Sequence, residues 1–253
     1  MKKVILTAFI CLTGMWAQAQ TTQVRQGKEA TKIEVKDGIE VIITQNDTTA
    51  VKIETATAAI LQKVVTKYSG NTLKISLDNP DGNMIDGAVT VYVSQKSFPL
   101  IKAQGGSAIK AAGKWAAENA DIDLATGATF TGELEITGTF TVKAVSGAVF
   151  RGIINAGIFN GTLLSGASAK LQGTAKLANV YCSGGSLQAA KFICQKAKVL
   201  AQNASSVSIQ AKEFIKAEAD TSSSVTYYGE PGLTQLGDNT FAIKRNTNKL
   251  SLN

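Results

Sequence analysis

A motif of small residues recurs about every 20 positions between residues 105 and 225. Its copies are Gly105–Ser107, Gly127–Thr129, Gly147–Val149, Gly166–Ser168, Gly184–Ser186, Asn203–Ser205 and Thr221–Ser223. Short stretches of alternating polar and apolar residues separate the copies. A motif that recurs at a fixed period, with strand-like sequence between its copies, is typical of a solenoid of stacked coils. We therefore predict corners at the small residues and short strands between them.

The segment from 103 to 219 is rich in alanine and glycine and poor in long apolar side chains. Such a composition suits a narrow interior, in which strands face each other closely and corners need small residues. Alternation predicts which side chains point inward: Ile122, Leu124, Leu134, Ile136, Phe140, Val142, Ile158 or Phe159, Leu171, Leu177, Leu187, Phe192, Val199, Val207 and Ile209. Two alanine-rich stretches, 108–120 and 189–201, also permit a helix. Glycines around the first and alternation within the second favour strands.

Three further segments complete the predicted organisation. Residues 20–102 contain alternating strands with longer apolar side chains and form the N-terminal coils. The ambiguous stretch 58–68 could hold a helical turn at 59–62 before a strand at 64–68, and 79–87 is expected to be a loop. Residues 103–225 form the regular coils, and 226–253 form a C-terminal cap, because the open end of a solenoid needs cover. Residues 20–253 are expected to be one continuous domain.

The first nineteen residues have the pattern of a secretory signal peptide. Lys2 and Lys3 precede an apolar run at 4–16, and Ala17-Gln18-Ala19 is a small-x-small cleavage site. The run is shorter than a membrane span requires, and no later segment is apolar enough to cross a bilayer. We expect export to the periplasm, the outer-membrane surface or the medium.

Removal of this segment would leave Cys182 and Cys194 as the two cysteines. In an oxidising compartment the two thiols are candidates for a disulfide. The alternative is a pair of small apolar residues packed in neighbouring strands. The sequence leaves both interpretations open.

The net charge of +7 is unevenly distributed, because residues 136–212 carry basic side chains and no carboxylate. The basic residues are Lys143, Arg151, Lys170, Lys176, Lys191, Lys196, Lys198 and Lys212. The first seven form a candidate partner-binding face for a polyanion such as an acidic polysaccharide. The alternative is that they keep a repetitive sheet soluble and block edge pairing. The scarcity of arginine and interleaved aromatics argues against nucleic acid.

Few residues suggest catalysis, and we predict no catalytic, cofactor-binding or metal-binding residue. The chain has no histidine, which excludes a serine–histidine triad or a histidine-ligated metal. The nearest carboxylate cluster comprises Glu118, Asp121, Asp123, Glu133 and Glu135, a candidate glycosidase or calcium site or simply a solvated sheet face. Four aromatic residues could stack on sugars or fill a core: Trp115, Tyr181, Tyr227 and Tyr228.

Three blocks of sequence, in order, resemble one family of exported bacterial proteins. They are Ile33–Gln45 with Val51–Glu54, Leu73–Ile75 followed by the coils with Gly-Ser or Gly-Ala corners, and Val225–Pro231. The family is the putative auto-transporter adhesins with a head GIN domain, formerly a domain of unknown function. The resemblance covers essentially all of the chain after the signal segment. It implies a right-handed parallel β-helix in an exported protein of Gram-negative bacteria, and it carries no catalytic or ligand residues.

The expected fold is therefore all-β, a right-handed parallel β-helix with coils of about 18 to 22 residues and a short C-terminal cap. The expected function is that of an exported, non-catalytic, adhesin-like protein, whose long face binds an envelope or extracellular partner such as a glycan. Two alternatives remain: a carbohydrate-active β-helix enzyme, and a structural envelope protein that self-associates as a homo-oligomer.

Overall fold

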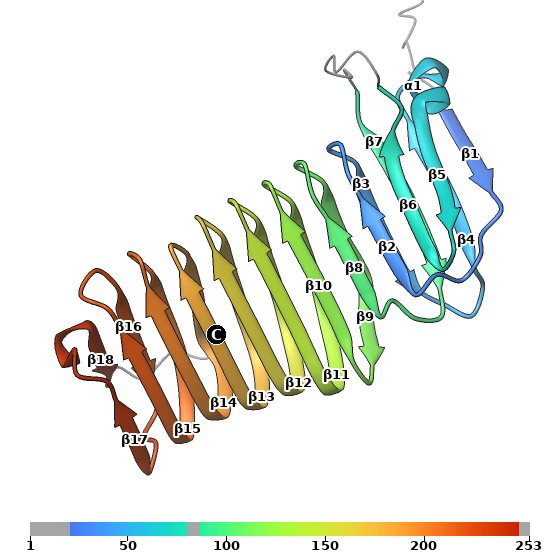
Figure 1. The fold of residues 1–253 in the computed structure, drawn as a ribbon. Helices are drawn as coiled ribbons and strands as arrows, with labels where there is room; N and C mark the ends of the chain where they lie inside the picture. Colours follow the sequence, from blue (N-terminus) through green and yellow to red (C-terminus); the bar gives the residue numbers. More distant parts are fainter. Residues whose placement is uncertain (1–20, 80–86, 248–253) are drawn as a thin grey trace, which may run out of the picture.

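The computed structural model describes residues 21–79 and 87–247 as a parallel β-solenoid of about eight turns (Figure 1). Its eighteen described strands join in one hydrogen-bonded sheet that winds around the long axis. The prediction of an all-β parallel β-helix is confirmed. The expected signal peptide, most of the expected loop at 79–87 and the last six residues lie outside the described residues. No described helix is both long enough and apolar enough to cross a membrane.

Each regular coil contributes to two sheets that face each other across the interior. The strands are β8 (Leu100–Ala103), β9 (Ala108–Ala117), β10 (Ala120–Ala125), β11 (Thr129–Val145), β12 (Val149–Leu164), β13 (Ser168–Ser183), β14 (Ser186–Gln202) and β15 (Ser206–Ala219). The long strands β11 to β15 bend midway, so that their first and second halves pair separately. We call the stack formed by β8, β10 and the second halves sheet I. The stack formed by β9 and the first halves is sheet II.

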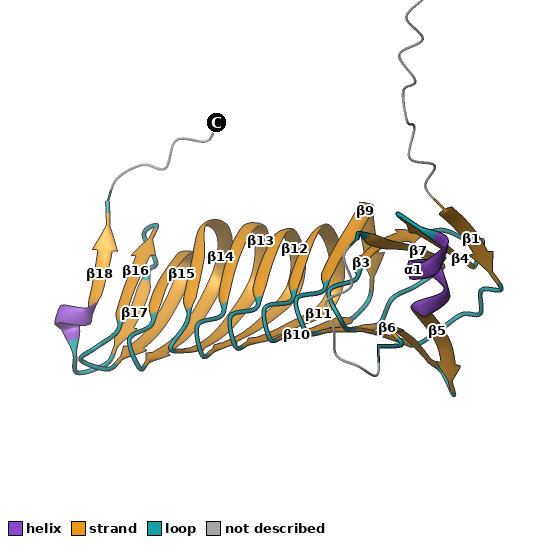
Figure 2. Ribbon diagram, turned by 90° about the horizontal axis from the view of Figure 1, so that it is seen from above, coloured by secondary structure: helices purple, strands orange, loops and turns teal. Residues whose placement is uncertain are grey.

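Sharp corners return the chain from sheet I to sheet II, and they stack along one edge of the rod (Figure 2). Two consecutive residues at a corner adopt left-handed backbone angles, as in Ser146 (φ 55°) and Gly147 (φ 73°). Glycine adopts these angles without the penalty that a Cβ atom brings. Hydrogen bonds continue through the corners: the N–H of Gly127 donates to the carbonyl of Ser146 at 3.0 Å. The predicted small-residue corners are thus present at the expected period.

A continuous series of aromatic rings runs through the interior. It comprises Phe98, Trp115, Phe130, Phe150, Phe140, Phe159 and Phe192, each ring within 6.3 Å of the next between centroids. Small residues such as Ala178 and Ala197 are buried beside them and keep the interior narrow.

The predicted inward residues are buried with one exception. Leu177 is only partly buried, because the bend of β13 lies just before it and directs Ala178 inward instead. Phe159, rather than Ile158, fills the interior in the preceding coil. The two alanine-rich stretches for which a helix was an alternative belong to β9 and β14.

The N-terminal coils do not stack in sequence order. The coil of β2 (Lys32–Val35) and β3 (Glu40–Gln45) lies between β6–β7 and β8–β9, as Figure 1 shows. Antiparallel strands close this end through the pairs β1–β4, β4–β7 and β5–β6. Their bounds are β1 (Thr21–Arg25), β4 (Ala50–Thr55), β5 (Val64–Ser69), β6 (Thr72–Leu77) and β7 (Val89–Gln95). The helical turn expected near residue 58 is α1 (Ala58–Lys63), capped by the side chain of Thr57.

The C-terminal segment continues the same sheets. β16 (Ser224–Tyr228) and β18 (Ile243–Asn246) extend sheet II, while β17 (Leu233–Leu236) extends sheet I by pairing with β15. A short 3₁₀ turn, η1 (Thr240–Ala242), precedes β18. Within the described residues the segment expected as a cap is therefore an incomplete last coil, with Leu233 and Phe241 exposed at the end of the rod.

Candidate functional site

Ion pairs hold five of the eleven lysines between residues 21 and 135. Lys102 Nζ lies 2.9 Å from Asp123 Oδ2, and Lys114 Nζ lies 3.3 Å from Glu135 Oε2. Further pairs are Lys32–Glu34, Lys52–Glu54, Lys110–Glu40 and Lys114–Glu133. Exposed pairs of this kind add little stability individually. Their main effect here is to neutralise the lysines at the centre of these coils, Lys102, Lys110 and Lys114.

The middle coils carry no carboxylate of their own, although Asp123 of β10, which is paired with Lys102, is the register partner of Lys143. Among the residues that the structure describes, none of the eight basic residues from Lys143 to Lys212 forms an ion pair. All eight are exposed. Positive charge along this part of the rod is therefore available to a partner.

The seven residues predicted to form one binding face are divided around the rod. Lys143 and Lys198 lie on the outer surface of sheet I. On sheet II, Arg151 and Lys170 are register partners in adjacent coils, and Lys191 lies one coil further on. Lys176 and Lys196 lie at the bend between the sheets. Alternation identifies an outward residue, but it does not say which of the two sheets carries it.

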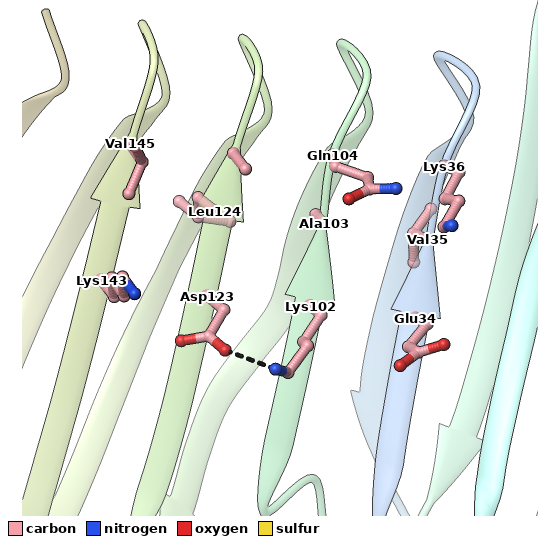
Figure 3. A pocket seen from close by; sticks show the side chains of 11 residues that line it. Glu34, Val35, Lys36, Lys102, Ala103, Gln104, Asp123, Leu124, Lys143 and Val145 are labelled. Atoms are coloured by element: carbon pink, nitrogen blue, oxygen red, sulfur yellow. Dashed lines mark ion pairs between the residues drawn. The ribbon is translucent and has the colours of Figure 1, made fainter. Parts of the chain in front are cut away.

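Two hollows mark the outer surface of sheet I. The first, which we call the N-terminal hollow, has a volume of about 410 Å³ and crosses β2, β8, β10 and the second half of β11 (Figure 3). Its charged lining residues are Glu34, Lys36, Lys102, Asp123 and Lys143. The Lys102–Asp123 ion pair spans it, and hydrogen bonding to Asp123 raises the pKa of Lys102. Hydrogen bonding to Lys32 lowers the pKa of Glu34, so these groups stay charged at neutral pH.

The second, or C-terminal hollow, has a volume of about 380 Å³ and lies over the second halves of β12 to β15. One row of outward residues along it contains Asn160, Asn179, Lys198 and Lys216. The neighbouring row contains Thr162, Tyr181, Leu200 and Glu218. The hollow therefore combines amide groups and lysines on one side with an aromatic ring and an aliphatic side chain on the other.

Sequence reasoning did not identify these two rows, although a signal for them exists. Asn160 and Asn179 are 19 residues apart, and the amide of Asn179 donates to Asn160 Oδ1 at 2.9 Å. Polar residues at the same offset in successive coils must stack on one another in a solenoid. A comparison of outward residues coil by coil would have found them.

The carboxylates considered for catalysis do not share a site. Asp121 and Asp123 lie on sheet I, whereas Glu133 and Glu135 lie on sheet II. Hydrolysis of a glycosidic bond needs two carboxyl groups facing one substrate, one of them with a raised pKa. Hydrogen bonds from Asn155 and Lys114 instead lower the pKa of Glu135. The described residues contain no cluster of three or more histidine, cysteine or acidic side chains placed to hold a metal.

Of the four aromatic residues considered as sugar contacts, Tyr181 has the most exposed side chain. It is 37% exposed, whereas Trp115 and Tyr227 are buried. Tyr228 is half-buried and its hydroxyl accepts a hydrogen bond from Asn246 at 3.4 Å. Trp115 packs edge-on against Phe98 inside the coil, and its Nε1 has no partner there.

The two cysteines are free and buried, so the disulfide considered as one alternative is not formed. Cys182 points inward from sheet I near a corner, and Cys194 points inward from sheet II near the bend. The thiols thus lie on different sheets, with Cys182 near the C-terminal end of β13 and Cys194 at the middle of β14. Burial raises the pKa of Cys194 to about 12, as expected for an inert thiol in an apolar interior.

The sequence matches the family model described as "Putative auto-transporter adhesin, head GIN domain" over residues 30–231. No curated protein is similar enough in sequence to match.

Solved structures share the fold at low sequence identity. A putative adhesin from Parabacteroides merdae is 13% identical with a TM-score of 0.76, over 90% of this chain and 96% of that one. A putative adhesin from Parabacteroides distasonis is 14% identical with a TM-score of 0.71, over 91% and 98%. A second protein from that organism, described as a putative lipid binding protein, is 15% identical with a TM-score of 0.68, over 90% and 97%. These similarities establish a common architecture.

Proposed function

Since the chain belongs to the putative auto-transporter adhesin, head GIN domain family, we propose that it is an exported, non-catalytic, adhesin-like protein that binds an acidic partner. The partner is an envelope or extracellular polymer, and the contact surface is the outer face of sheet I. The observation that carries this proposal is the unpaired positive charge of the middle coils. Both hollows lie on this same face and provide the relief that a flat sheet lacks.

The proposed mechanism is the sum of many weak contacts along a rigid rod. One exposed ion pair contributes about 0 to 1 kcal/mol, which is too little to hold a partner alone. Lys143 and Lys198 are fixed on hydrogen-bonded strands of the same sheet, so a polymer can engage both with little additional loss of backbone entropy in the protein. Arg151, Lys170 and Lys191 on sheet II add long-range attraction without direct contact.

Export belongs to the same proposal. The family description suggests an exported protein, and residues 1–19 carry the charge and hydrophobicity pattern of a signal peptide. We expect cleavage after Ala19, so that the exported chain begins at Gln20. Sequencing the N-terminus of the protein recovered from outside the cytoplasm measures this directly.

The proposal is tested by binding of the chain from residue 20 to an acidic polysaccharide immobilised on a surface. Measurements at about 0.01, 0.1 and 1 M salt change the screening length from about 30 to about 3 Å. We expect the affinity to fall steadily across this series, and a neutral polysaccharide to bind weakly throughout. Equal binding to the acidic and neutral polymers at all three salt concentrations would overturn the proposal.

A further inference from the structure

We infer that the C-terminal hollow of sheet I binds an acidic oligosaccharide, with Tyr181 under a sugar ring and Lys198 beside a carboxylate of that ligand. This inference rests on the proposed function and specifies where on sheet I the partner is recognised. It follows from the aromatic, amide and charged groups that converge on this hollow.

Tyr181 provides an apolar platform on an otherwise polar strand surface. The residue is 37% exposed, and its hydroxyl donates one long hydrogen bond of 3.4 Å to Gln202 Oε1. Leu200 is its register partner in the next coil and extends the apolar area. An exposed aromatic ring with a polar tip suits a ligand that has one apolar face and a rim of hydroxyls, as a pyranose does.

The neighbouring row offers hydrogen bonds at the edge of this platform. Asn179 uses one amide hydrogen to bind Asn160 Oδ1. The amide NH₂ of Asn160 and the amide oxygen of Asn179 keep further donor and acceptor capacity. Ligand pockets commonly combine an apolar surface with a few polar groups that fix orientation, and this hollow has both.

One positive charge in the hollow is not neutralised, which selects an acidic ligand over a neutral one. Lys216 is paired with Glu218 at 2.9 Å. Lys198 lies in the same row and, among the described residues, has no acidic partner. A sugar carboxylate placed beside Lys198 would complete the pairing.

The spacing of these groups favours an oligosaccharide over a single sugar. Lys198 is in the coil after Tyr181 and two positions away along the strand direction. Strand spacing and rise place their Cα atoms about 8 Å apart. Two adjoining sugar units therefore fit best: one stacks its ring on Tyr181, and the next places its carboxylate beside Lys198.

The N-terminal hollow is a less suitable site for the same ligand. Its central lysine, Lys102, is already paired with Asp123, and its lining contains no aromatic residue. A bound carboxylate there would have to compete with Asp123 and would lie near Glu34.

The inference is tested by calorimetric titration of the chain from residue 20 with short oligogalacturonate, and with the neutral galactose oligomer of the same length. Tyr181→Ala removes the platform, and Lys198→Gln removes the free charge. Ile153→Ala on sheet II and Lys67→Gln on β5 make comparable changes at exposed positions away from the hollow and serve as matched controls. Thermal melts of all four variants verify that the fold is intact.

We expect Tyr181→Ala to weaken oligogalacturonate binding about tenfold, the size typical of an aromatic contact at the centre of a binding site. Lys198→Gln should weaken it severalfold and remove the preference for the acidic over the neutral oligomer. Both controls should stay within about twofold, because a short ligand in the hollow reaches neither sheet II nor β5.

Two results would overturn this inference and leave the proposed function standing. One is unchanged affinity of Tyr181→Ala for oligogalacturonate. The other is absence of oligogalacturonate binding by a chain that still binds the immobilised acidic polysaccharide in a salt-dependent way. Failure to bind either probe would overturn the proposed function as well.

Discussion

Left-handed backbone angles are required at the corners, and the chain does not always place glycine there. Asn203 and Ala204 have φ values of 56° and 61°, whereas Ser146 is followed by Gly147 at the equivalent corner. For a residue with a Cβ atom, the left-handed region costs about 1 to 2 kcal/mol. Each such residue is therefore slightly strained, and the hydrogen bonds between stacked corners hold it in the left-handed conformation.

Ala204→Gly should raise the free energy of unfolding by about 0.5 to 1 kcal/mol, since relief of strain exceeds the extra entropy of glycine in the unfolded chain. The hydrogen bond from its backbone N–H to the Ser222 side-chain Oγ does not use the Ala204 side chain and therefore persists. The matched change is Gly147→Ala, whose new Cβ would meet no atom within 4 Å. It should lower stability by about 1 kcal/mol in urea unfolding. A change of the unfolding free energy in the same direction for both variants would show that the corner residues are not strained.

Asp220 should make stability depend on acid pH. Its carboxylate accepts a hydrogen bond from the N–H of Asn203 at 2.6 Å and from the hydroxyl of Ser222 at 2.9 Å. The Asn203 hydrogen bond is the main cause that lowers the pKa of Asp220 to about 2 from its ordinary value of 3.8. Because the folded-state pKa is the lower one, this stabilisation is complete above about pH 4 and is lost as the pH falls through about 2.

Asp220→Asn is therefore expected to unfold at lower urea concentration than the wild type at pH 7. The difference between the two chains should narrow at pH 2, where about half of the wild-type carboxyl is protonated even in the folded state. Urea titrations of both chains at the two pH values measure this, and an equally wide difference at both would show that ionisation of Asp220 is unimportant.

At the scale of the element, one coil buries few side chains and depends on its neighbours for a core. Phe150 illustrates this, because its ring stacks on Phe130 at 5.2 Å in one neighbouring coil and lies 5.8 Å from Phe140. In a solenoid, stability comes largely from such contacts between adjacent repeats. Loss of this one ring should therefore remove two ring contacts between β11 and β12 at once.

Phe150→Ala is expected to cost about 3 to 5 kcal/mol of unfolding free energy, the usual range for a buried aromatic residue replaced by alanine. Phe241→Ala is the control, because this ring is 91% exposed on the last turn. It should change stability by less than about 0.5 kcal/mol. Thermal or urea unfolding compares the two variants. A similar loss of unfolding free energy for both would show that the aromatic series does not stabilise the core.

The coils themselves could be predicted from the sequence because corners and alternation are local features. Gly127, Gly147 and Gly166 mark the period, and alternating residues between them point inward and outward. Leu177 was wrongly predicted to point inward, because the bend of β13 shifts the alternation of inward and outward residues by one position. The insertion of β2–β3 between β6–β7 and β8–β9 depends on pairing between distant segments, and no local pattern records it.

For the whole molecule, the uneven charge was evident from sequence but its placement was not. The absence of carboxylates between residues 136 and 212 indicated a stretch of one charge sign, but not that Asp123 is the register partner of Lys143. The pairing of Lys102 with Asp123 depends on which coils are adjacent, and the separation of Lys143 from Arg151 depends on which sheet each half-strand joins. The two hollows likewise depend on which large and small outward side chains lie next to each other on neighbouring coils, and the order of residues along the chain does not show this.

The central claim is that unpaired lysines on sheet I, rather than net charge, bind the acidic partner. Two double variants test it on the same sheet with the same loss of charge. Lys143→Gln with Lys198→Gln removes two lysines that have no ion pair among the described residues, and Lys32→Gln with Lys102→Gln removes two that are paired with Glu34 and Asp123.

The decisive measurement is the affinity of these two variants for an immobilised acidic polysaccharide at about 0.1 M salt. Two lost contacts of about 0.5 to 1 kcal/mol each predict that the Lys143 and Lys198 variant binds about five- to thirtyfold more weakly. The Lys32 and Lys102 variant should remain within about threefold of the wild type. Equal weakening of the two variants would show that net charge alone governs binding and would contradict the account.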